Sequence, residues 1–548
     1  MAQVDGGALV ARFLKQEQVD VIFTLCGGHI QNIYAGCQDE GIRIIDTRHE
    51  QASAHAAEGW TRANKRPGVC AVTAGPGVTD AVTGMANAYQ NRSPMIMIGG
   101  AAPLNQIGRG ALQEMNTLDM MKPISKWAVR VHHTQRIPEI MAEAWRVATT
   151  GRMGPVYIEI PSDVLHGRIE EDQLPPMPKG YRTTGRVAGD PALVGEAAKA
   201  IRDAEKPLVM AGSQIYWSTA HEELRQFVEK IQSPVYLNAM GRGSIRQDHP
   251  LFFSRTRRNA LAEADVVVII GTPMDFRLQY GRRIRPESKV IMIDSDPSEI
   301  GRNRGVDIGI EGDAKTVLNQ LLAELEGVRR EPGSWIGSLR EVENKILELR
   351  QQWMNSDATP IHPLRLCKEM ASFVDDNTIV VGDGGDIVSN AAQILPINNP
   401  GQWYDPGLLG TLGVGTGFCM GIHCTYPDKK ILMVNGDGTF GLNGFEFDTF
   451  VRFGMPVVSV VGNDRQWGQI TVGLVRAYGR ERAAPTLLQD NSRYDRVVEA
   501  LGGHGEFVTE PKDIRPAIER AFASGKPACV NVIMDQMPPG VEGGYEFL

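Results

Sequence analysis

Two aspartates follow two apolar stretches in the last third of the sequence. Asp437 stands between Gly436 and Gly438 at the end of KILMVNGDG, and Asp464 ends PVVSVVGND twenty-seven residues later. Apolar runs punctuated by glycine predict strands of a parallel sheet, so both carboxylates should lie at its carboxyl edge. Mg²⁺ prefers hard oxygen ligands and completes its octahedron with phosphate oxygens and water. The spacing therefore predicts a site for Mg²⁺ and a phosphate, with a following backbone carbonyl as a third protein ligand.

This pattern resembles the fingerprint of the thiamine-diphosphate enzymes, in which GDG is followed after twenty-odd residues by Asn-Asn. Here the terminal pair is Asn463–Asp464, a variant that keeps a metal-binding oxygen and adds a charge. The resemblance implies thiamine diphosphate and Mg²⁺ as cofactors. The metal ligands that it implies are Asp437, Asp464 and Gln466. The residues that it implies around the cofactor's diphosphate are Gly436, Asp437, Gly438, Thr439, Asp464 and Gln466.

A glutamate at the start of a predicted helix is the second candidate catalytic feature. Glu50 follows the strand-like run IRIID and precedes a helix of small residues. An acid also suits an ordinary helix start, because acids are favoured at that end of the helix dipole. In the thiamine enzymes a glutamate at this place contacts N1′ of the aminopyrimidine and promotes its imino form, which makes the cofactor nucleophilic. The resemblance assigns this role to Glu50 and places the cofactor between the first and last domains of two subunits.

The segment YDPGLLGTLGVGTG, residues 404–417, is a glycine-rich turn before a predicted helix. In related enzymes this loop holds the pyrimidine ring, and an apolar side chain beneath the ring forces the cofactor to bend. The resemblance gives that wedge to Leu412, a carbonyl contact to Gly410 and a further cofactor contact to Thr73. The same glycines also suit close helix packing alone.

Segments along the whole chain resemble benzaldehyde lyase and, more closely, the acetolactate synthase-like 2-hydroxyacyl-CoA lyases. The segments that carry this likeness include LCGGHIQNIY, RGALQEMNTL and EFDTFVRFGMPVVSVVGNDRQWGQI. The resemblance implies that His29 relays a proton to or from the substrate hydroxyl, since an imidazole exchanges protons near neutral pH. It places Gln113 beside the aminopyrimidine and the substrate oxygen. His29 as a capping group and Gln113 as a surface residue remain the alternatives.

The activity implied is a thiamine-diphosphate- and Mg²⁺-dependent carbon–carbon lyase or carboligase. Its substrate would be a 2-hydroxyacyl-CoA, cleaved to an aldehyde or ketone and formyl-CoA. The alternatives are an acetolactate synthase and a benzaldehyde-lyase-like acyloin lyase; a flavin-binding redox protein and a non-catalytic thiamine-fold protein represent other classes. The tail MDQMPPGVEGGYEFL has no Lys or Arg to bind CoA, although Tyr545 and Phe547 could cover an adenine.

A recurring hydrophobic pattern predicts the strands and helices that position these residues. Short aliphatic runs ending in glycine alternate with helical patterns over the whole length, which predicts an α/β fold with parallel sheets flanked by helices. Two polar, proline-containing stretches (170–191 and 324–363) divide the chain. The predicted domains are a pyrimidine-binding domain (1–172), a central Rossmann-like domain (190–330) and a diphosphate-binding domain (360–540). Residues 72–100 and 434–463 share a strand, glycine turn, helix, proline and second strand, which favours a duplicated domain.

The central domain has acids at two predicted strand ends, Asp294 and the EGD at 311–313. Such an acid can bind a ribose hydroxyl, as in dinucleotide-binding folds. The GxGxxG phosphate loop is absent before it, and relatives carry FAD, ADP or nothing here. ADP or FAD in this domain is therefore an open expectation.

The composition of the chain limits the class of protein and the partners that we expect. The chain has 548 residues, 42% hydrophobic and 22% charged, and a formal net charge of −8. These values are typical of a globular protein and argue against a basic nucleic-acid-binding face. Seven cysteines form no CxxC pair, no signal-peptide pattern opens the chain, and no apolar run reaches about 18 residues. We therefore expect a cytoplasmic protein without membrane or nucleic-acid partners, acting on a small molecule as a homodimer or homotetramer.

Overall fold

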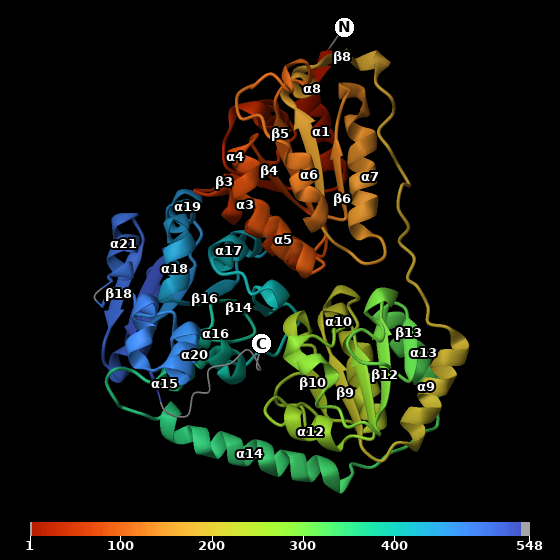
Figure 1. The fold of residues 1–548 in the computed structure, drawn as a ribbon, viewed down its shortest axis with the longest axis vertical. Coiled ribbons are helices and arrows are strands. Elements are labelled where there is room, and N and C mark those ends of the chain that lie inside the picture. Colours follow the sequence, from red (N-terminus) through yellow and green to blue (C-terminus); the bar gives the residue numbers. More distant parts are fainter. Residues whose placement is uncertain (1–2, 491, 539–548) are drawn as a thin grey trace.

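The computed structural model describes residues 3–490 and 492–538. The apolar runs of the sequence form the strands of three parallel sheets, and helices cover the faces of each sheet (Figure 1). The predicted α/β fold with three parallel sheets is confirmed. The proposed adenine cover, Tyr545 and Phe547, lies outside the described residues.

The N-terminal sheet has six parallel strands in the order β3-β2-β4-β5-β7-β6. Its strands are β2 (Val21–Thr24), β3 (Arg43–Asp46), β4 (Gly68–Val72), β5 (Met95–Ala101), β6 (Trp127–Arg130) and β7 (Val156–Pro161). Its helices are α1 (Gly6–Gln16), α2 (Gln31–Asp39), α3 (Glu50–Asn64), α4 (Pro76–Asp80), α5 (Val82–Gln90), α6 (Thr117–Met121), α7 (Ile137–Thr149) and α8 (Ser162–His166). Every residue of β4 and β5 is buried, as a sheet covered on both faces requires.

The C-terminal sheet repeats this topology, with the order β15-β14-β16-β17-β19-β18. Its strands are β14 (Thr378–Asp383), β15 (Trp403–Tyr404), β16 (Lys430–Gly436), β17 (Val458–Asn463), β18 (His504–Val508) and β19 (Ala528–Ile533). Its helices are α15 (Pro363–Ala371), α16 (Asp386–Ile394), α17 (Val414–Thr425), α18 (Asp437–Asn443), α19 (Phe447–Phe453), α20 (Gly468–Tyr478), α21 (Tyr494–Ala500) and α22 (Ile514–Ala523). Counted along the chain, both sheets have the order 2-1-3-4-6-5, so the predicted likeness of the two domains holds.

The central sheet has five parallel strands in the order β10-β9-β11-β12-β13. Its elements are β9 (Pro207–Ala211), β10 (Val235–Leu237), β11 (Val266–Ile270), β12 (Lys289–Asp294), β13 (Ile308–Glu311), α9 (Pro191–Asp203), α10 (Ser213–Trp217), α11 (His221–Ile231), α12 (Arg257–Glu263) and α13 (Ala314–Glu324). The long helix α14 (Ser334–Met354) then runs along one side of the molecule to the C-terminal domain (Figure 1). A small antiparallel pair, β1 (Gln3–Asp5) with β8 (Arg168–Glu170), joins the two ends of the first domain.

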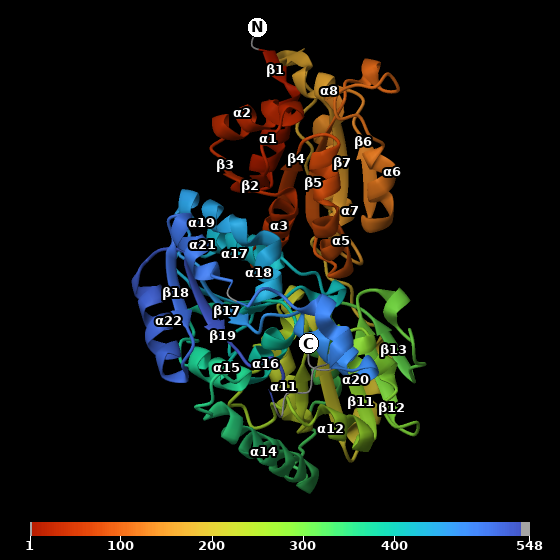
Figure 2. The same ribbon diagram turned by 60° about the vertical axis from the view of Figure 1, so that its left-hand side comes forward.

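The N-terminal and C-terminal domains meet through α3 and α17 (Figure 2). Glycines allow this close approach: a Cβ on Gly421 would lie 2.2 Å from the Ala56 carbonyl oxygen, and one on Gly59 would lie 2.7 Å from Phe418 Cα. One hydrophobic core runs across the contact, from strands of the first sheet to strands of the last. Among the described residues, no helix has both the length and the apolar composition needed to span a bilayer.

Candidate active site

The first half of the site lies at the carboxyl ends of β2, β4 and β5. His29 sits in a short 3₁₀ turn after β2, and its Nδ1 lies 3.3 Å from Oγ1 of Thr73, the residue that follows β4. A Cβ on Gly27 would lie 2.2 Å from Thr73 Cβ, and one on Gly100 would lie 2.8 Å from His29 Cβ. Glycine at both places therefore lets the imidazole loop close onto the ends of the strands.

Glu50 is the first residue of α3 and is 7% exposed. A Cβ on Gly77 would lie 2.8 Å from Thr73 Cγ2 and 3.5 Å from Glu50 Oε1, so Glu50 and Thr73 flank the same glycine. Burial raises the pKa of the Glu50 carboxyl. No side chain in the described part of the chain bonds to this carboxylate, which leaves it available to a ligand.

Gln113 lines a cavity of about 660 Å³ together with Gly75 and Gly100. Its backbone has a φ of 58°, a left-handed conformation that costs free energy in a non-glycine residue. The neighbouring Glu114 holds the loop: its carboxylate accepts backbone N–H bonds from Gly108, Gly110 (3.0 Å) and Ala111 (2.9 Å). These bonds lower the pKa of Glu114. The structure thus brings His29, Glu50, Thr73 and Gln113 to one edge of the first sheet.

The second half lies at the equivalent edge of the C-terminal sheet. Asp437 begins α18 directly after β16; its carboxylate accepts N–H bonds from Gly438 (2.8 Å) and Arg465 (2.7 Å). Asp464 follows β17, and burial together with repulsion from Asp437 raises the pKa of its carboxyl. A Cβ on Gly468 would lie 2.7 Å from an oxygen of Asp464 and from one of Asp386, the first residue of α16. Three carboxylates therefore converge on one edge.

This edge fits a divalent cation bound to a diphosphate. Buried like charges are costly unless a cation compensates them. Glycines line the space, since a Cβ on Gly384 would lie 3.0 Å from Thr439 Oγ1 and 3.3 Å from the Gly436 nitrogen. Within 3–490 and 492–538, no group of three or more His, Cys, Asp or Glu side chains could hold a metal ion alone. A cation here would therefore need backbone and phosphate oxygens as well.

The side chain of Gln466 is held beside Asp464, and its backbone carbonyl could bind such a cation. Its side-chain Nε2 donates to the Gln536 carbonyl (2.7 Å) and to Asp464 (3.1 Å). The assignment of Gln466 as a metal ligand remains a prediction.

Gly410 and Leu412 precede α17 on a turn that two buried polar side chains hold. Asp383 at the end of β14 accepts N–H bonds from Gly413 (3.0 Å) and Gly415 (2.7 Å), and burial raises its pKa to about 7. Asn443 of α18 donates to the Gly413 carbonyl at 2.6 Å. The half-buried Leu412 is thus anchored to the sheet edge that carries Asp437. Sequence reasoning missed Asp383, although it ends the strand-like run TIVVGD, residues 378–383.

Within one chain, the two halves are joined at the start of α3. Glu446, 1% exposed, accepts an N–H bond from Arg48 at 2.9 Å, two residues before Glu50, and burial raises its pKa to about 7. Arg452 adds an ion pair to Asp46 at 3.1 Å. Among the described residues, no hydrogen bond or ion pair links His29, Glu50 or Gln113 to Asp437 or Asp464.

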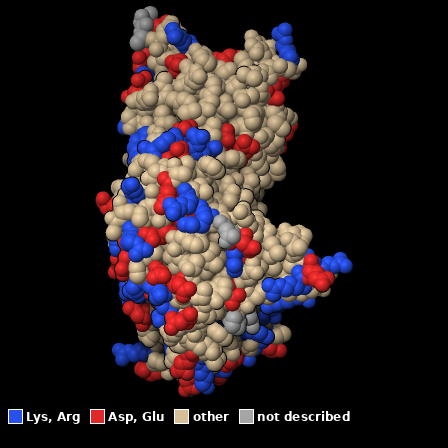
Figure 3. Space-filling view, turned by 90° about the vertical axis from the view of Figure 1, so that its left-hand side faces the viewer, with Lys and Arg blue, Asp and Glu red and all other residues tan. Residues whose placement is uncertain are grey.

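Each half is bordered by exposed apolar side chains. Leu112 beside Gln113 is 78% exposed, and Phe445 after α18 is 68% exposed. Further exposed apolar residues are Met115 on the loop of Gln113, Leu409 in the turn before α17, and Leu442 in α18. Part of the N-terminal domain's surface also carries few charged side chains (Figure 3). Apolar surface of this kind is typical of an interaction site.

Three models of the thiamine pyrophosphate enzymes match the chain: the N-terminal TPP binding domain over residues 4–120, the central domain over 194–321, and the C-terminal TPP binding domain over 383–532. A probable acetolactate synthase of Mycobacterium bovis is 39% identical over 529 residues, which cover 96% of this chain and 95% of that protein. The 2-hydroxyacyl-CoA lyase 2 of Caenorhabditis elegans is 34% identical over 96% of this chain and 89% of its own. The human 2-hydroxyacyl-CoA lyase 2 is 33% identical over 96% and 90%.

Proposed function

Because the chain belongs to the thiamine pyrophosphate enzymes, we propose that it cleaves a 2-hydroxyacyl-CoA to an aldehyde or ketone and formyl-CoA, with thiamine diphosphate and Mg²⁺. The observation that carries the proposal is His29, held 3.3 Å from Thr73 beside the buried Glu50. A lyase of this kind must remove a hydroxyl proton as a carbon–carbon bond breaks, and an imidazole suits that task.

Each residue has a distinct part in this reaction. Bound thiamine diphosphate supplies a thiazolium that stores the electron pair of the broken bond. Glu50, with its raised pKa, can hold and share a proton at its carboxylate oxygen. With Nδ1–H of His29 donating to Thr73 Oγ1, Nε2 would be unprotonated and would take the hydroxyl proton while the O–H electrons form the carbonyl of the released aldehyde or ketone. Gln113 can donate to the substrate oxygen. Asp437, Asp464 and the Gln466 carbonyl would hold Mg²⁺.

The complete site would form between two copies of the chain. The apolar borders at Leu112 and Phe445 support this arrangement, because a second copy would cover them. The N-terminal half of one subunit would then face the C-terminal half of its partner. The assembly would be a homodimer or a homotetramer, acting in the cytoplasm.

Acetolactate synthase is the second candidate. Its support is the 39% identity to the Mycobacterium bovis protein, which exceeds the identity to the two lyases. In that case His29 and Gln113 would act on pyruvate and its condensation partner.

The test is incubation of the purified protein, with thiamine diphosphate and Mg²⁺, against three substrates in parallel. Formyl-CoA together with an aldehyde or ketone from a 2-hydroxyacyl-CoA would support the lyase. Cleavage of benzoin alone would move the assignment to acyloin lyases. Acetolactate from pyruvate, without formyl-CoA, would replace the proposal by the synthase.

A further inference from the structure

The turn before α17, residues 404–412, is held by the N-terminal domain of the same chain. Arg62 of α3 donates to the Asp405 carbonyl at 2.8 Å. Asn91, which follows α5, donates to the Pro406 carbonyl at 2.9 Å. Two side chains from another domain therefore hold two consecutive carbonyls of this turn.

The same Asn91 side chain also holds the next part of the turn. Its Oδ1 accepts the N–H of Leu408 at 3.3 Å. Gly407 has a φ of 72°, and a Cβ at this position would overlap that oxygen. Glycine at 407 thus allows the turn to lie against Asn91. Gly410 and Leu412, the residues expected beside the cofactor's pyrimidine, follow directly in the sequence.

One buried carboxylate orients both of these side chains. Glu58 of α3 is fully buried, and it accepts bonds from Arg62 Nε at 3.0 Å and Asn91 Nδ2 at 3.3 Å. Ser93 (3.0 Å) and Asn87 (2.7 Å) donate to the same carboxylate. A buried charge is stable only when it is paired and hydrogen-bonded, and a fully bonded network of this kind has one low-energy arrangement. Glu58 therefore fixes the directions of Arg62 and Asn91.

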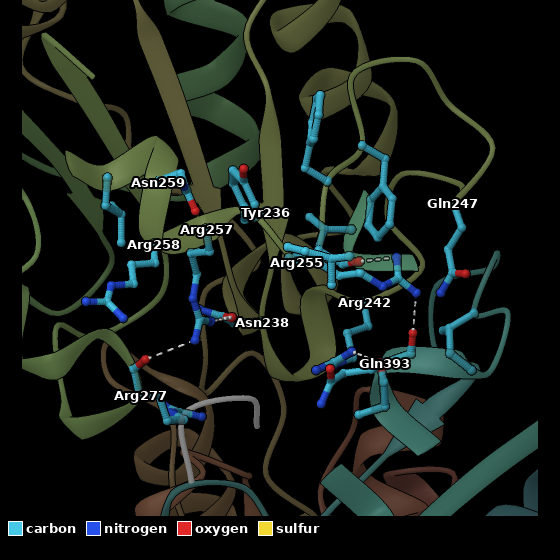
Figure 4. Close-up of a pocket in the computed structure, with 18 of the residues that line it drawn as sticks. Tyr236, Asn238, Arg242, Gln247, Arg255, Arg257, Arg258, Asn259, Arg277 and Gln393 are labelled. Atoms are coloured by element: carbon cyan, nitrogen blue, oxygen red, sulfur yellow. Dashed lines mark hydrogen bonds between the residues drawn. The ribbon is translucent and has the colours of Figure 1, made fainter. Parts of the chain in front are cut away.

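The base of the turn has a separate support. Trp403 of β15 donates from its indole nitrogen to Asp405 Oδ2 at 2.7 Å. The guanidinium of Arg242 lies over the Trp403 ring, 5.4 Å from its centroid. Arg242 belongs to the central domain and lines the cavity of about 490 Å³ shown in Figure 4. Loss of the Asn91 bonds should consequently loosen the later part of the turn and leave its base in place.

We infer that Glu58, Arg62 and Asn91 are positioning residues that hold the turn ready for the cofactor's pyrimidine. This role rests on the proposed thiamine-diphosphate chemistry, in which Gly410 and Leu412 would face that ring. A turn that is already ordered adds to affinity, because the ligand does not have to order it. Among the described residues, no hydrogen bond joins the three side chains to Asp437 or Asp464. The network should therefore affect pyrimidine binding and leave diphosphate binding unchanged.

The test compares two probes by calorimetry on the full-length protein with Mg²⁺: thiamine diphosphate, and inorganic pyrophosphate, which has no pyrimidine. Asn91→Ala removes the bonds to the turn but leaves Glu58 paired with Arg62. We expect the Kd for thiamine diphosphate to rise at least about tenfold, and the Kd for pyrophosphate to stay unchanged. Asn64→Ala is the matched control, because Asn64 of α3 bonds across the same domain contact to Thr425, at 2.6 Å, away from the turn.

Arg62→Lys tests the other arm of the network. The lysine keeps a positive charge beside Glu58, but it lacks the guanidinium fork that bonds to both Glu58 and the Asp405 carbonyl. The same selective rise in the Kd for thiamine diphosphate is expected. A general defect in folding would instead weaken the binding of both probes together.

Equal weakening of both probes in Asn91→Ala and Arg62→Lys, or an unchanged affinity for thiamine diphosphate, would overturn the inference. A selective loss in a protein that forms no formyl-CoA supports the positioning role and refutes the proposed lyase. Lyase activity together with normal thiamine diphosphate binding in both variants supports the lyase and refutes the positioning role. The two can therefore fail separately.

Discussion

The N-terminal and C-terminal domains share one sheet topology but differ in chemistry at the same edge. In the C-terminal domain, the segments after β14, β16 and β17 place three carboxylates there: Asp386, Asp437 and Asp464. In the N-terminal domain, the equivalent segments after β2, β4 and β5 place a histidine, a hydroxyl and a methyl: His29, Thr73 and Ala102. The sheet topology is the same, whereas the side chains at these strand ends differ.

This difference indicates which edge suits cofactor binding and which suits proton transfer. A carboxylate edge suits a cation and a diphosphate, whereas an edge with an imidazole and one buried glutamate suits proton transfer. Under the proposed function, two domains of one topology would divide the work: one edge would hold the cofactor's diphosphate and the other would transfer protons, according to the side chains at each edge. Changes at the two edges should consequently have different effects.

The largest effect is expected at the N-terminal edge. Glu50→Gln should lower kcat by about 10²–10⁴-fold, because the carboxyl can no longer share a proton. Thiamine diphosphate binding and circular dichroism should stay unchanged. Glu139→Gln, on an exposed glutamate of α7, is the control. Full activity in Glu50→Gln would place the proton chemistry elsewhere.

A change at the C-terminal edge should act on the metal instead. Asp437→Asn removes one charge from the carboxylate edge, so the Mg²⁺ concentration for half-maximal activity should rise at least about tenfold. Saturating Mg²⁺ should restore much of kcat, which it cannot do for Glu50→Gln. Asp428→Asn, on an exposed residue of the same domain, serves as the control. An unchanged Mg²⁺ requirement would contradict the assignment of this edge.

The position of the loop that carries Gln113 should depend on the bonds that the Glu114 carboxylate accepts from its backbone. Glu114→Gln removes the anionic acceptor of three backbone N–H groups, so the loop should loosen and KM should rise by roughly tenfold with a smaller change in kcat. Glu114→Asp should restore part of the affinity, which a purely structural defect would not predict. Steady-state kinetics of both variants measure this, and an unchanged KM would mean that these bonds do not position Gln113.

The smallest effect concerns the junction between the two domains. The Glu446 pKa is raised from 4.5 to about 7, so folding retains a proton that the unfolded chain loses. The stability that this group contributes is therefore fully present below pH 4.5 and is lost as the pH rises through 7, by about 3 kcal/mol. Glu446→Gln should flatten the fall in Tm between pH 5 and 7.5. Parallel pH profiles of the two proteins would contradict this.

Local patterns predicted the architecture well. A run such as KILMVNGDG predicts both a buried strand and the glycine turn that ends it. The pattern shared by residues 72–100 and 434–463 predicted the sheet topology that the two domains have in common. The placement of His29, Glu50, Thr73 and Gln113 on one edge agrees with the resemblance, while their catalytic roles remain predictions.

Residues whose importance depends on distant contacts could not be found in this way. Glu446 acts on the amide of Arg48, nearly four hundred residues away in the sequence, and nothing near it in the chain signals this. Asp383 resembles any other polar end of a strand until the turn at Gly413 packs onto it. The arginines that line a cavity of about 490 Å³ between the central and C-terminal domains are spread between positions 242 and 350 and come together only through folding.

The central claim is that one active site combines the reacting edge of one subunit with the anchoring edge of another. Mixing Glu50→Gln chains with Asp437→Asn chains tests it directly, at a Mg²⁺ concentration where each variant alone is inactive. Subunit exchange should restore activity toward about a quarter of the wild-type value, because each mixed pair contains one intact site. Activity that stays at the level of the separate variants, after exchange has been verified, would mean that both edges serve the site of their own chain.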